Sequence, residues 1–99
     1  MKGIAVRADR WAPVSAGEYD HRTRTLSVNM TVVDQVHARF GHEPASVITA
    51  IIAHERVHAL STRVALAHEE ERRARAAAIE VGGAELVAHI DEVLAGAWT

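Results

Sequence analysis

The chain has 99 residues, no cysteine and a formal net charge of −2. This length supports one domain with one core, and the lack of cysteine excludes disulfides and cysteine-ligated zinc sites. Interleaved acidic and basic residues argue against nucleic-acid binding, no apolar run approaches the about 18 residues of a membrane span, and no secretory signal follows Met1, so the predicted location is the cytoplasm.

Three short strands are expected within residues 1–30. Residues 3–8 favour the first strand, and residues 11–17 are expected to form a loop because they contain Pro13 and Gly17. Residues 18–20 and 25–30 predict two further strands joined by a turn, since apolar and polar residues alternate along the second of them. The prediction is a small antiparallel or mixed sheet.

Four helices are expected after the strands, at about 31–41, 44–62, 66–81 and 84–98. The first begins at Thr31 or Asp34 and stops at Gly41, and the second has Pro44 in its first turn with Ser46 as a candidate N-cap. The third is rich in Ala, Arg and Glu and ends before a Gly-Gly pair.

The last predicted helix is a packing element with His89 as an ordinary surface residue on its flank. Its apolar stripe consists of Leu86, Val87, Ile90, Val93, Leu94 and Trp98. Taken together, the elements predict an α+β fold in which the second helix is central.

The second predicted helix contains an H-E-x-x-H pattern, His54-Glu55-Arg56-Val57-His58. Residues four apart share one face of a helix, so His54 and His58 can present two imidazole nitrogens to one metal ion. Glu55 is rotated by about 100° and can reach a water on that ion, whereas Arg56, at about 200°, points toward solvent. Two neutral nitrogens beside a carboxylate base are what a hydrolytic zinc site requires.

A catalytic zinc site also needs a third protein ligand. On the third predicted helix, Glu71 falls within a stripe of small residues that is expected to face the core, formed by Ala67, Ala74 and Ala78. A carboxylate there is costly unless a cation meets it, so Glu71 is the first candidate, followed by Glu70 and then His68. The alternative interpretation of residues 69–73 is a solvated charge run with Glu–Arg helix pairs.

The motif helix, followed by the Glu-rich and Ala-rich segment 69–74, resembles the zincin-type metallopeptidases with a His-His-Glu ligand set. The closest likeness is to the small ImmA/IrrE-like zincin domains of bacteria and phages. The resemblance implies a minimal zincin-like fold over residues 1–99, Zn²⁺ held by His54, His58 and Glu71, and Glu55 as the residue that activates water. It also implies an edge strand above the motif helix, here Thr25–Asn29, that pairs with an extended substrate.

The predicted function is therefore a zinc-dependent hydrolase, a metallopeptidase acting on a peptide or protein. Candidate donors to the developing oxyanion are Tyr19, His21, Arg24 and His42. The alternative is a catalytically silent zincin-like binding or regulatory module, which the short chain favours; a partner protein or a second copy of the chain would complete the cleft. A third interpretation is a helical domain in which the motif occurs by chance.

Overall fold

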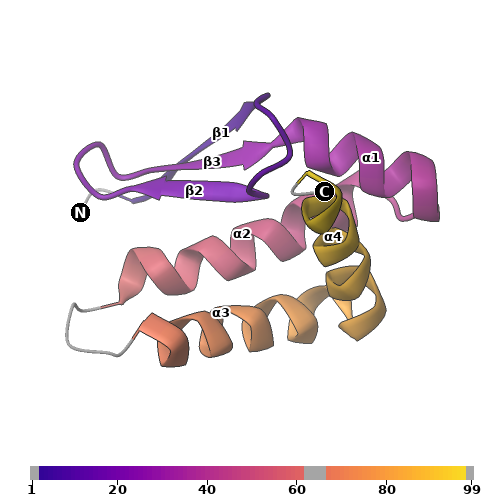
Figure 1. The fold of residues 1–99 in the computed structure, drawn as a ribbon. Coiled ribbons are helices and arrows are strands. Elements are labelled where there is room, and N and C mark those ends of the chain that lie inside the picture. The colour runs from indigo at the N-terminus through magenta and orange to yellow at the C-terminus, as the bar shows by residue number, and fades with distance from the viewer. Residues whose placement is uncertain (1–2, 62–66, 98–99) are drawn as a thin grey trace.

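The computed structural model describes residues 3–61 and 67–97, which form a three-stranded mixed sheet followed by four helices. The predicted α+β arrangement is confirmed. Figure 1 shows the central helix between the sheet on one side and the next helix on the other, with the last helix crossing at one end. Among the described residues, no helix is long and apolar enough to cross a membrane.

The sheet contains β1 (Ala5–Asp9), β2 (Gly17–Asp20) and β3 (Thr25–Asn29). β3 lies in the middle, where it pairs with β1 in parallel and with β2 in antiparallel orientation. The prediction that Thr25–Asn29 is an edge strand is therefore wrong, because β3 pairs with β2 along one edge and with β1 along the other. β2 is an edge strand, and it contacts the central helix directly.

The helices are α1 (Met30–Phe40), α2 (Pro44–Leu60), α3 (Ala67–Gly82) and α4 (Ala84–Gly96). Gly41 ends α1 as predicted, with a left-handed φ of 77° and its N–H donating to the His37 carbonyl. Ser46 is not the N-cap of α2: Glu43 occupies that position, and the fixed φ of Pro44 starts the helix without a side-chain cap.

Helix α1 begins earlier than Thr31, because Asn29 is its N-cap. The fully buried Asn29 side chain accepts hydrogen bonds from the N–H groups of Thr31 and Trp11. It also donates to the carbonyls of Ala12 and Ser15. The Asn29 side chain thus forms a hydrogen bond to a free N–H group in the first turn of α1 and fixes the loop that leads into β2.

The core lies between the sheet and the helices. β3 contributes Leu26 and Val28, and the helices contribute the rest: Val32, Val33, Val36, Val47, Ala50, Ile51, Ala78, Leu86, Val87, Ile90 and Val93. The predicted stripe of α4 is confirmed within the described residues, and Trp98 lies outside them. On α3, Ala74 and Ala78 are buried as expected, but Ala67 and Glu71 are exposed.

Candidate metal centre

The two motif histidines lie on one face of α2, one turn apart, as the pattern predicts. Their ring centroids are 5.1 Å apart, and both side chains are about three-quarters buried, with exposed fractions of 27% for His54 and 23% for His58. Arg56 is exposed, which confirms that it points away from them. No cation of this helix therefore competes with a metal at the histidine face.

Glu71 joins the two histidines from the neighbouring helix. Its Oε1 lies 2.6 Å from Nε2 of His54, and its Oε2 lies 3.0 Å from Nε2 of His58. The side chain is 59% exposed, so the predicted reason for choosing it, a charge buried among alanines, is wrong. Glu71 reaches the site because α3 runs back along α2 in the opposite direction (Figure 1).

The other nitrogen of each ring meets a different carboxylate. Nδ1 of His54 donates to Oε2 of Glu55 over 2.7 Å, and Nδ1 of His58 donates to Oε2 of Glu70 over 2.8 Å. Such outer carboxylates orient metal-binding histidines and leave Nε2 to face the ion. Glu70 therefore lies on the outer side of His58. His68, the third candidate, is exposed and is not part of the group whose donor atoms converge.

These contacts shape the charge of the site in the metal-free protein. The hydrogen bond to Glu55 raises the pKa of His54, and the bond to Glu71 adds to this effect, while burial opposes it. Hydrogen bonds from Ser61 and His58 lower the pKa of Glu70. Because an ionised carboxylate can only accept, this arrangement favours the protonated ring of His54.

The donor atoms of His54, His58 and Glu71 fit a zinc ion. All three lie within 4.8 Å of one another, and two imidazoles with one carboxylate suit zinc and leave a fourth position open. Zinc bonds of about 2.0–2.2 Å place ligand atoms of a tetrahedron about 3.3 Å apart. The contacts of 2.6 and 3.0 Å are made by the two different oxygens of Glu71 and are shorter than that spacing, so the carboxylate would move outward to admit an ion.

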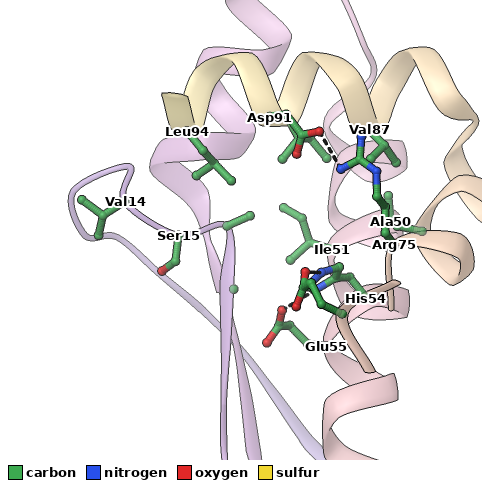
Figure 2. A pocket seen from close by; sticks show the side chains of 15 residues that line it. Val14, Ser15, Ala50, Ile51, His54, Glu55, Arg75, Val87, Asp91 and Leu94 are labelled. Atoms are coloured by element: carbon green, nitrogen blue, oxygen red, sulfur yellow. Dashed lines mark hydrogen bonds and ion pairs between the residues drawn. The ribbon is translucent and has the colours of Figure 1, made fainter. Parts of the chain in front are cut away.

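A cavity of about 260 Å³ opens beside Glu55. Figure 2 shows His54 and Glu55 at one end and Val87, Asp91 and Leu94 of α4 at the other. Its walls are mainly apolar and include Val14, Ala50, Ile51, Ala78, Val87, Ile90 and Leu94. Arg75 and Asp91 form an ion pair of 2.6 Å at its side, so the cavity combines an apolar interior with one charged pair.

Gly17 brings β2 close to this site, a role that the sequence did not reveal. A Cβ atom at Gly17 would lie 2.9 Å from Cγ of Glu55 and 2.9 Å from Cγ2 of Ile51. The sequence marked Gly17 only as a loop breaker, whereas it is the first residue of β2. A side chain at this position would displace Glu55 or Ile51, so glycine permits the close approach of the strand to α2.

Of the four predicted oxyanion donors, only Tyr19 lies on the helix-facing side of β2. It alternates with Glu18, is half-buried and packs against the core, on the same face of the strand as Gly17. His21 and Arg24 are exposed in the turn after β2. His42 is not part of this site, because its ring contacts His89 of α4.

Comparison of the chain with protein-family models, with curated proteins and with solved structures gives no match.

Proposed function

We propose that this chain is a zinc-dependent hydrolase that cleaves peptide bonds. The observation that carries the proposal is the convergence of Nε2 of His54 and Nε2 of His58 on the Glu71 carboxylate, with Glu55 beside them. A zinc ion held by these three residues would lower the pKa of a bound water and polarise a substrate carbonyl. The likeness of the motif to the zincin metallopeptidases supports a peptide as the substrate.

Glu55 is the proposed general base. Glu55 is only 8% exposed, and it lines the cavity where a substrate carbonyl would sit. Its carboxylate would accept a proton from the attacking water and pass it to the nitrogen of the departing amine. In the metal-free structure the Glu55 carboxylate is bonded to Nδ1 of His54, on the side of the ring away from Nε2, so it would have to turn toward a metal-bound water to act as the base.

The substrate is proposed to bind along β2. Among the described residues, no strand pairs with the outer edge of β2, so an extended peptide could add to it through backbone hydrogen bonds. An apolar side chain of that peptide would enter the cavity between Ile51 and Leu94. Cleavage of cytoplasmic peptides is part of the proposal, because a cysteine-free chain has no need of an oxidising compartment.

One observation favours a second candidate, a metal-binding module without turnover. The Glu55 carboxylate accepts a hydrogen bond from Nδ1 of His54, which is the contact of an outer carboxylate that orients a ligand. In that case a partner protein or a second copy of the chain would use the site for binding. The two candidates differ in what Glu55 does.

The Glu55→Gln variant separates them. An amide oxygen can still accept from His54, so the fold and the zinc affinity should persist, whereas the base is lost and hydrolysis of a peptide library should fall by about 10²–10⁴-fold. Zinc content and cleavage are measured on the same samples, with Glu69→Gln, an exposed carboxylate on α3, as the matched control. If the wild type holds zinc but cleaves no peptide, the second candidate replaces the first.

A further inference from the structure

A second group of potential metal ligands lies where the α1–α2 loop meets α4. Nε2 of His42 is 2.8 Å from Nδ1 of His89, although 47 residues separate them in the chain. Glu85 lies one turn before His89 on the same face of α4. The three residues can offer one donor atom each, all within 4.8 Å of one another. Two imidazoles and one carboxylate thus converge from two separate segments.

The two rings of this group are held in place by their neighbours. The His89 ring stacks on Phe40, with centroids 3.9 Å apart and an angle of 4° between the planes. Nδ1 of His37 donates to the His42 carbonyl over 2.9 Å, and Gly41 fixes the backbone as the C-cap of α1. Both histidines are half-buried, and Glu85 is exposed. The loop therefore presents His42 to α4 without further ordering, which favours ligand binding.

We propose that His42, Glu85 and His89 form a second zinc site, independent of the one on α2 and α3. Imidazole nitrogens with a carboxylate oxygen select zinc and related transition metals, whereas Ca²⁺ and Mg²⁺ prefer oxygen ligands alone. The competing account of the geometry is a neutral His42–His89 hydrogen bond, in which one ring donates and the other accepts.

The position of the second site indicates a structural role. Val87 and Leu94 lie about 200° and 180° around α4 from Glu85, and both line the cavity beside Glu55. An ion on the opposite face would tie α4 to the loop that precedes α2, without entering the cavity. It would thereby fix the wall of the cavity from behind.

The test begins with the His54→Ala/His58→Ala double variant, which lacks the first centre. Samples are dialysed against Zn²⁺, and bound metal is measured by elemental analysis, with circular dichroism to check folding. We expect about one zinc per chain, and a higher melting temperature when zinc is added. Adding either His42→Ala or Glu85→Gln should lower the zinc affinity further. The loss should exceed the factor of about 10–100 that removal of an outer partner causes.

The control is His21→Ala, which removes an imidazole from the exposed turn after β2 and should leave the zinc content unchanged. A folded double variant that binds no zinc would overturn the proposal, as would zinc binding that survives both His42→Ala and Glu85→Gln. If the double variant does not fold, the count is made in the otherwise unchanged chain. In that chain, Glu85→Gln should lower the number of bound zinc ions from two to one, and an unchanged number would refute the second site.

Discussion

At the scale of single residues, the two nitrogens of each motif histidine have different partners. Both Nε2 atoms face Glu71. By contrast, Nδ1 of His54 faces Glu55, and Nδ1 of His58 faces Glu70. This division assigns Glu71 to the inner side of the site and Glu70 to the outer side. Neighbouring glutamates on one helix can thus have separate roles, because they approach the same ring from its two ends.

Glu71→Gln should weaken zinc binding more than Glu70→Gln does. The first change replaces a charged ligand with a neutral amide, whereas the second weakens only an outer contact and should cost about 10–100-fold in affinity. Zinc titration calorimetry measures both, in a His89→Ala background so that only this centre is titrated. If Glu70→Gln removes the metal and Glu71→Gln does not, the roles of the two glutamates are reversed.

Zinc affinity should increase with pH, and the stability of the metal-free chain should change in the opposite direction. Hydrogen bonds to Glu55 and Glu71 raise the pKa of His54 above its ordinary value of 6.5. The folded chain therefore binds this proton more tightly than the unfolded chain. That stabilisation is complete below the ordinary pKa and is lost as the pH rises through the raised one.

Zinc requires the neutral ring, so binding should improve over the same range in which the proton leaves. Zinc titrations and thermal unfolding of chelator-treated protein across about pH 5.5–8.5 test both statements. His54→Gln serves as the comparison for the metal-free protein, since it removes the titrating group. A zinc affinity that does not change with pH would contradict the account of His54.

At the scale of secondary-structure elements, the close approach of β2 to α2 depends on Gly17. In Gly17→Ala, the new methyl group would lie 2.9 Å from Cγ of Glu55, which is too close for a normal contact. We expect a loss of about 1–3 kcal/mol in the free energy of unfolding and lower hydrolysis, with zinc retained, because neither histidine is touched. Denaturant unfolding, peptide cleavage and zinc content measure the three effects.

Gly3→Ala is the matched control for this prediction. A Cβ atom at Gly3 meets nothing within 4 Å, so stability and activity should stay near those of the wild type. Gly17→Ala with unchanged stability and unchanged activity would show that β2 can move away from α2 freely. The strand would then not position Glu55.

The start of α1 shows how a local signal can be present in the sequence and still be assigned to the wrong residue. Asn is a strong N-cap residue, and Asn29 directly precedes α1. The alternation of residues 25–30 assigned Asn29 to the strand, and it is in fact the last residue of β3 and the cap of α1 together. Its bonds to the loop before β2 join residues 14 and more positions apart, which no local pattern predicts.

At the scale of the whole molecule, the order of elements was predictable and their packing was not. Apolar periodicity and the Gly and Pro residues between segments predicted three strands and four helices in the correct order, with ends close to those observed. The strand order β1-β3-β2 depends on pairing between β1 and β3, which are neighbours in the sheet although β2 lies between them in the sequence. Local periodicity carries no information about such pairing.

The candidate site, too, was predictable in part: the sequence predicted the contacts within one helix but not those between helices. Helical spacing predicted that His54 and His58 share a face, because four residues make about one turn. The contacts of residues on α3 and α4 depend on how the helices pack. Glu71 of α3 reaches the two histidines from an exposed position, and His89 of α4, away from this site, stacks on Phe40 instead of lying free on the surface. Spacing within one helix is a local property, whereas contacts between helices require the fold.

The central claim is that His54, His58 and Glu71 hold one zinc ion beside Glu55. The most direct measurement is an anomalous diffraction map at the zinc absorption edge, from crystals of the protein grown with zinc. The account predicts a peak bonded to both Nε2 atoms and to a Glu71 carboxylate oxygen, with Glu55 close by but not a ligand. No peak between the two histidines, or a peak that Glu70 ligates in place of Glu71, would contradict it.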